Sequence, residues 1–117
     1  MYDVKTFNAI AQSGLDTFKN DFEINKTDDP DAYLIRSVNL LEADFPQSLK
    51  TIVRAGAGVN NIPLDRVTEK GIAVFNTPGS NANAVKELIV ALMIATKRNL
   101  FAAHRYSDEH TEADVSQ

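Results

Sequence analysis

Residues 51–76 read TIVRAGAGVNNIPLDRVTEKGIAVFN, and their pattern decides the fold class. The segment 50–56 (KTIVRAG) is predicted to be a strand, and so is 72–78 (IAVFNTP), which stops at Pro78. Between them, 63–71 (PLDRVTEKG) begins with proline and ends with glycine, as helices commonly do. A strand, a helix and a strand in this order predict a βαβ unit and therefore a parallel sheet.

The flanking segments extend the same alternation. Further strands are expected at 4–10, 22–25 and 32–37, a short helix at 13–21 with Ser13 as its capping residue, a polar turn at 26–31, and a helical or turn segment at 40–49. A long helix is expected from Asn81 towards Tyr106, followed by an acidic end. The sequence therefore predicts an α/β domain with an open parallel sheet, helices on both faces and a long C-terminal helix.

Composition limits the class of protein. The chain has 117 residues, the size of one domain, and a net charge of -4. The negative charge argues against a general nucleic-acid binder, and the lack of cysteine excludes disulfides, thiolate zinc sites and a cysteine nucleophile. No secretory signal is visible, and the longest strongly apolar run, 88–95, is far shorter than the roughly 20 residues of a membrane span. We expect a soluble, cytoplasmic protein without a membrane partner.

The apolar run 88–95 also bears on how the expected helix is covered, because it leaves no polar stripe on that part of the helix. A helix that is apolar all round must be covered on all sides. It is either a well-buried central helix or a helix on whose outer face a second domain or a partner subunit packs. We favour the second interpretation, because one α/β layer of this size covers one side only.

The glycines at 56–61 begin like a dinucleotide-binding loop but do not continue as one. The fingerprint G-x-G-x-x-G needs a third glycine, and Asn61 stands in its place. Pro63 delays the following helix, and the acidic residue expected at the end of the next strand is replaced by Asn76. A nucleotide-binding role for this loop is therefore disfavoured.

Two other interpretations of the loop stay open. Its glycines could supply positive φ angles to a strand-to-helix turn. Alternatively, the N–H groups of residues 56–59 could bind an anion beside Arg36 and Arg54, which both stand at predicted strand ends. Arg54 also has a purely structural alternative, an ion pair with Asp65 or Glu69.

The remaining candidate residues are given structural roles. The histidines, His104 and His110, stand near Asp108, Glu109 and Glu112 and are expected to be solvated surface and no metal site. Ser13, Ser80 and Asn81 are interpreted as helix-start residues and not as nucleophiles, because no histidine is placed to activate a serine.

Four motifs then occur in a specific order: LIRS (34–37), RAGAGVNN (54–61), GIAVFNTPG (71–79) and AVKEL (84–88). Over residues 32–98 the chain resembles the N-terminal substrate domain of D-isomer-specific 2-hydroxyacid dehydrogenases. The resemblance implies a flavodoxin-like domain, NAD as cofactor, and a small 2-hydroxy acid as substrate, foremost 3-phosphoglycerate, which is oxidised to 3-phosphohydroxypyruvate in serine biosynthesis. An unphosphorylated 2-hydroxy acid, or a stand-alone flavodoxin-like binding module, is the alternative.

The resemblance also assigns residues. It implies substrate binding by Arg36, Ser37, Arg54, Gly56, Ala57, Gly58 and Val59, weak cofactor contacts by Ala57, Asn81 and Ala84, and no catalytic or metal-binding residue in this chain. The methyl group of Ala57 cannot donate the hydrogen bond that a threonine gives in relatives, and Glu87 is interpreted as structural.

It further implies a substrate-binding domain at 1–100, and a segment at 101–117 that ends the crossover helix and leads to a nucleotide-binding domain not included in the chain. The chain alone is then inactive, and the whole enzyme is a homodimer or tetramer.

Overall fold

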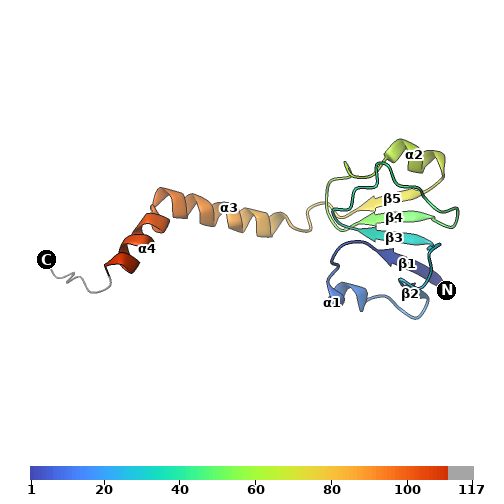
Figure 1. The fold of residues 1–117 in the computed structure, drawn as a ribbon, viewed down its shortest axis with the longest axis horizontal. Coiled ribbons are helices and arrows are strands. Elements are labelled where there is room, and N and C mark those ends of the chain that lie inside the picture. Colours follow the sequence, from blue (N-terminus) through green and yellow to red (C-terminus); the bar gives the residue numbers. More distant parts are fainter. Residues whose placement is uncertain (111–117) are drawn as a thin grey trace. The chain divides into compact units, whose positions relative to one another are not determined.

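The computed structural model describes residues 1–110, which fall into two compact units, one of residues 1–80 and one beginning at Asn81 (Figure 1). The first unit contains β1 (Tyr2–Thr6), α1 (Gln12–Leu15), β2 (Phe22–Ile24), β3 (Ala32–Ile35), β4 (Thr51–Arg54), α2 (Leu64–Glu69) and β5 (Ala73–Asn76). The second contains α3 (Ala82–Lys97) and α4 (Leu100–Glu109).

The five strands form one parallel sheet in the order β2-β1-β3-β4-β5 (Figure 1). This is the strand order of flavodoxin-like folds, so the predicted open parallel α/β architecture is confirmed. Ile35 pairs with Arg54, and Arg54 pairs with Asn76. The carboxyl ends of β3, β4 and β5 are therefore level, and the segments that follow them leave from one edge of the sheet.

The core forms around β3 and the neighbouring β4, where Ile35 and Ile52 are completely buried. The connection from β3 to β4 contains no helix, which agrees with the turn alternative for 40–49. This connection still contributes to the core, through the buried side chains of Leu40, Phe45 and Leu49.

Arg66 of α2 attaches that connection to the helix. Its Nη1 donates to the carbonyl of Leu41 at 2.6 Å, and its Nη2 donates to the carbonyl of Ala43 at 2.9 Å. Because these carbonyls belong to a segment without regular structure, the guanidinium supplies donors that a helix would have provided internally.

The C-terminus of α2 confirms the role predicted for its glycine. Gly71 has φ +70°, its N–H donates to the carbonyl of Thr68 at 2.9 Å, and the N–H of Ile72 donates to the carbonyl of Val67 at 2.9 Å. These two bonds define a Schellman motif, and its usual apolar contact is available because Val67 and Ile72 are both buried.

Two helix predictions were wrong in detail. The helix expected at 13–21 is the short α1, whose N-terminal cap is Ala11, without a side-chain bond, in place of Ser13. Gly14 weakens this helix from within, and no capping side chain supports its start. The long C-terminal helix is divided by Asn99, whose φ of 52° and ψ of 39° are left-handed. Asparagine adopts this conformation more readily than most residues, and helices commonly end there.

No residue of α3 is buried, and Leu88 and Met93 are 60% and 65% exposed. Within its own unit α3 is thus not covered, and both interpretations of the apolar run, a central helix and a helix covered by a second domain or subunit, stay open. None of the helices among residues 1–110 has the length and hydropathy of a membrane-spanning segment.

Candidate functional site

The structure brings Arg36, Arg54 and the loop 55–61 together at the carboxyl edge of the sheet. Arg54 ends β4, and Arg36 follows the last residue of β3. The Nε of Arg54 donates to the carbonyl of Arg36 at 2.8 Å. Ligands of open α/β sheets bind beyond the carboxyl ends of the strands, so this edge is the place to search for a site.

Arg54 is held by backbone carbonyls and not by carboxylates. Besides the bond to Arg36, its Nη1 donates to the carbonyl of Gly58. Among residues 1–110, Arg54 forms no ion pair with Asp65 or Glu69, so that structural alternative is wrong. The positive charge of a half-buried guanidinium therefore lies against the loop without a neutralising partner in the described part of the chain.

The glycines of the loop leave room for this arginine. Neither Gly56 nor Gly58 has a positive φ, so the proposed turn with left-handed glycines is wrong. A Cβ atom at Gly58 would lie 2.9 Å from the Nη1 of Arg54, and one at Gly56 would lie 3.5 Å from its Nε. Because 2.9 Å is closer than a carbon and a nitrogen normally approach, a side chain at position 58 would displace the guanidinium.

Three of the four predicted amide donors are available. The N–H of Gly56 is already bonded to the carbonyl of Arg54 at 2.9 Å. Within residues 1–110, the N–H groups of Ala57, Gly58 and Val59 have no hydrogen-bond acceptor. Successive unpaired amides next to an arginine can bind a carboxylate or a phosphate.

The structure adds Asn76 to the candidate site. In the sequence, Asn76 is noted only because it stands where a dinucleotide-binding site would have an acidic residue. Its Nδ2 donates to the carbonyl of Ala57 at 2.8 Å, and the N–H of Thr77 donates to the carbonyl of Gly56 at 3.0 Å. The position of Asn76 at the end of a predicted strand, level with Arg54, was the available signal for this contact.

A second asparagine, Asn8, supports the segment after β3. Its Oδ1 accepts from the N–H of Ser37 at 3.0 Å and from that of Val38 at 2.9 Å, while its own φ is 68°. Ser37 therefore has no free N–H to offer, and its predicted role is restricted to its hydroxyl. Arg36 itself is exposed, and its Nη1 donates to the carbonyl of Ala9 at 3.2 Å.

The other candidates have local contacts of their own. His104 lies 3.4 Å from a carboxylate oxygen of Asp108, and the ring of His110 stacks on Tyr106. No group of three or more potential metal ligands occurs among residues 1–110, and Glu112 lies outside the described residues. Ser80 donates to the carbonyl of Thr77 at 3.0 Å.

Asn81 and Ala84, predicted to contact a cofactor, lie in the second unit. Asn81 precedes α3 without a capping bond from its side chain.

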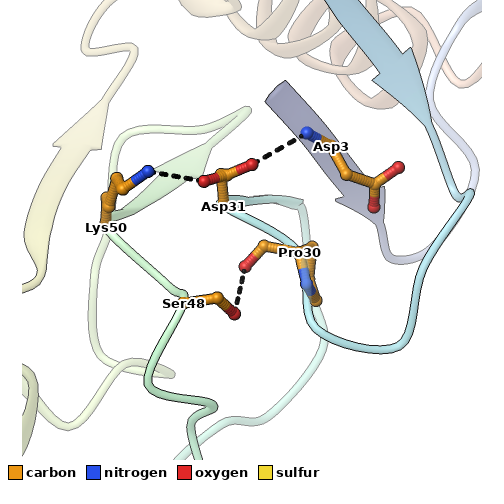
Figure 2. Close-up of polar contacts among 5 residues, drawn as sticks. All are labelled: Asp3, Pro30, Asp31, Ser48 and Lys50. Carbon is orange, nitrogen blue, oxygen red and sulfur yellow. Dashed lines mark hydrogen bonds and ion pairs between the residues drawn. The ribbon is translucent and has the colours of Figure 1, made fainter. Parts of the chain in front are cut away.

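A polar network lies at the opposite edge of the sheet, where β3 and β4 begin (Figure 2). The Nζ of Lys50 is 2.6 Å from Oδ1 of Asp31, and the N–H of Asp3 donates to Oδ2 of Asp31 at 3.0 Å. The Lys50 bond, followed by the Asp3 bond, holds the pKa of the Asp31 carboxyl below its ordinary value, and the bond to Asp31 raises the pKa of the Lys50 ammonium. Because the network joins three strands at their amino ends, we assign it to the fold and not to the candidate site.

Comparison with known proteins points to one family. Residues 4–111 match the family described as D-isomer specific 2-hydroxyacid dehydrogenase, catalytic domain. A hydroxypyruvate reductase of Thermotoga maritima is 42% identical over 76 residues, which are 62% of this chain and 25% of that protein. A D-3-phosphoglycerate dehydrogenase of Mycobacterium bovis is 37% identical over 84 residues, which are 69% of this chain and 16% of that protein.

A solved structure agrees with these relatives. The crystal structure of NAD+-bound 3-phosphoglycerate dehydrogenase of Entamoeba histolytica matches with a TM-score of 0.66 at 26% identity, covering 80% of this chain and 38% of that one. The chain thus spans a quarter or less of the length of these two curated relatives.

Proposed function

The chain belongs to the D-isomer specific 2-hydroxyacid dehydrogenase family, and on that premise we propose that it forms the substrate-binding domain of an NAD-dependent enzyme. The observation that carries the proposal is the loop after β4. Arg54 lies against this loop without a carboxylate partner among residues 1–110, and three successive N–H groups have no acceptor there. A carboxylate bound to these amides would be fixed by several donors at once.

D-3-phosphoglycerate is the substrate that we propose first. It carries two anionic groups, and the site offers two arginines and a row of amides. The amides of residues 57–59 would bind the carboxylate, while Arg36 and Arg54 would pair with the phosphate or the carboxylate. The likeness to D-3-phosphoglycerate dehydrogenases supports this choice.

A second candidate is a 2-hydroxy acid without a phosphate group. It is favoured by the 42% identity to a protein named hydroxypyruvate reductase. Such an acid would use the amides for its carboxylate and would leave Arg36, which is exposed, without a ligand. Only the phosphorylated acid would therefore need Arg36 for binding.

The loop 56–61 does not fit the pyrophosphate of a dinucleotide, because Asn61 replaces the third glycine and α2 begins only at Leu64. We propose that NAD is bound mainly outside this chain, with weak contacts from Ala57, Asn81 and Ala84. When bound, NAD accepts the hydride that leaves C2 of the hydroxy acid. The residues described here would bind and orient the acid, and orientation alone contributes substantially to the rate of such a transfer.

Several expectations follow for the whole protein. Residues 1–100 would bind substrate, 101–117 would connect to a nucleotide-binding domain, and the enzyme would be a cytoplasmic homodimer or tetramer. The 117-residue chain would not turn over substrate, because no residue in it is assigned to proton or hydride transfer. Measurable NAD-dependent turnover by this chain alone would contradict that statement.

The proposal is tested by calorimetric titration of the chain with D-3-phosphoglycerate and with D-lactate. We expect tighter binding of D-3-phosphoglycerate, and a loss of about tenfold to a hundredfold in the Arg54→Ala variant, since hydrogen bonds to charged groups are involved. Arg98→Ala, which removes an arginine at the end of α3, is the matched control. Binding of neither acid would favour a stand-alone module, and equal binding of both would favour the unphosphorylated substrate.

A further inference from the structure

We infer that Asn76 is a positioning residue, whose carboxamide fixes the direction in which the Gly58 amide faces. The inference rests on the proposed function, because it concerns the same loop. Asn76 is the last residue of β5 and pairs with Arg54 across the sheet. Its side chain is exposed, and its Nδ2 donates to the carbonyl of Ala57 at 2.8 Å.

The geometry of a peptide group carries this step. No cis peptide bond occurs among residues 1–110, and in a trans peptide the C=O and the N–H point in opposite directions. The carbonyl of Ala57 and the N–H of Gly58 belong to one peptide group. When Asn76 holds that carbonyl, the N–H of Gly58 must face away from Asn76.

The two neighbouring peptide groups are held in the same manner. The N–H of Thr77 holds the carbonyl of Gly56 at 3.0 Å, which orients the N–H of Ala57. The Nη1 of Arg54 holds the carbonyl of Gly58, which orients the N–H of Val59. Each of the three unpaired amides at 57–59 therefore has a donor fixed on the opposite side of its own peptide group.

Among these donors, Asn76 is the one that can be removed without changing either the backbone or the charge of the site. Thr77 acts through its main chain, and Arg54 carries the charge that the proposed ligand requires. Without Asn76, the peptide group between Ala57 and Gly58 is free to rotate. Preorganised donors bind an anion more tightly than donors that must first be ordered, so this freedom should weaken binding.

The test uses the 15N-labelled chain titrated with D-3-phosphoglycerate and observed by NMR. Asn76→Ala should weaken binding about tenfold, the size expected when the one hydrogen bond from the Gly58 amide to the charged acid is lost. It should also move the Gly58 amide resonance of the free protein. Asn76→Gln keeps an amide donor and should restore part of the affinity. Asn83→Ala is the control, since among residues 1–110 the Asn83 side chain bonds only to Glu87 and Lys86, both in α3.

Unchanged resonances of the buried Ile35 and Ile52 establish that each variant is folded. If Asn76→Ala loses them, Asn76→Ser provides the same test. An affinity within twofold of the unmodified chain in the alanine or serine variant, with the amides of 57–59 still responding, would overturn the positioning role and leave the proposed function intact. No response of those amides in the unmodified chain would overturn both.

Discussion

The guanidinium of Arg54 donates to the carbonyl of Gly58, and a Cβ atom at position 58 would lie 2.9 Å from its Nη1. The Arg54 side chain can therefore keep this position only because residue 58 has no side chain. In the pattern R-x-G-x-G (54–58), Gly58 is needed because it leaves space for the Arg54 side chain, and not because its backbone has a positive φ.

Replacing Gly58 by alanine should therefore displace Arg54. Because the displaced atom is the end of a flexible side chain, the free energy of unfolding should change by less than about 1 kcal/mol, whereas affinity for D-3-phosphoglycerate should fall about tenfold. Urea unfolding and calorimetry measure the two effects. Gly14→Ala is the control for affinity, since the added Cβ would meet no atom outside its local backbone; it should itself raise stability slightly, because Gly14 weakens α1. Full affinity in Gly58→Ala would contradict the packing role.

Replacing Gly71 by alanine should destabilise the chain by about 1–2 kcal/mol. Its φ is +70°, and no atom beyond the adjacent residues lies within 4 Å of an added Cβ, so the cost would come from the left-handed backbone alone. Urea unfolding measures the change. Gly71→Asn should lose less, because asparagine tolerates this conformation better than alanine. Equal stability of all three chains would disprove this explanation.

The pair of Asp31 and Lys50 predicts how stability depends on pH. The pKa of Asp31 is lowered, so its contribution is complete above the ordinary aspartate value of about 4 and is lost as the pH falls through the lowered pKa. The pKa of Lys50 is raised, so its contribution is complete below the ordinary lysine value of about 10.4 and is lost as the pH rises through the raised pKa.

Lys50→Met should therefore lower the urea midpoint at neutral pH and weaken its fall in acid. The acid dependence should not vanish, because the N–H of Asp3 still bonds to Asp31. Urea midpoints at about pH 3 and pH 7 measure both effects. Lys5→Met is the matched control, since the ion pair of Lys5 with Asp28 is long, at 3.9 Å. An unaltered acid slope in Lys50→Met would refute the assignment.

The exposed apolar surface of α3 predicts self-association of the isolated chain. Leu88, Leu92 and Met93 are 60%, 50% and 65% exposed, and apolar surface of this extent is seldom left open to water. Sedimentation velocity should show dimers or larger species, and Leu92→Glu should reduce them. Ala82→Glu adds the same charge to the same helix and should not. A monodisperse monomer of the unmodified chain would contradict the prediction.

The sheet was predictable because its signals are local. Apolar runs end at glycine or proline, and the Schellman motif at Gly71 was visible as a glycine that follows a helical pattern. The placement of Arg36 and Arg54 at one edge also followed from the sequence, since the carboxyl ends of parallel strands share an edge.

The remaining details depend on contacts between distant residues or on weak local preferences. Asn76 and Ala57 meet only through the register of β4 and β5, and Asn8 meets Ser37 only through the pairing of β1 with β3. The break at Asn99 was missed because asparagine is tolerated inside helices as well as at their ends.

The most direct test of the central claim, that the loop after β4 binds the carboxylate of the acid, is a map of amide shifts. The 15N-labelled chain is titrated with D-3-phosphoglycerate and, separately, with inorganic phosphate. We predict that the largest changes occur at the N–H groups of Ala57, Gly58 and Val59 with the acid, and that phosphate produces smaller changes there. Binding that leaves these three amides unmoved would contradict the claim.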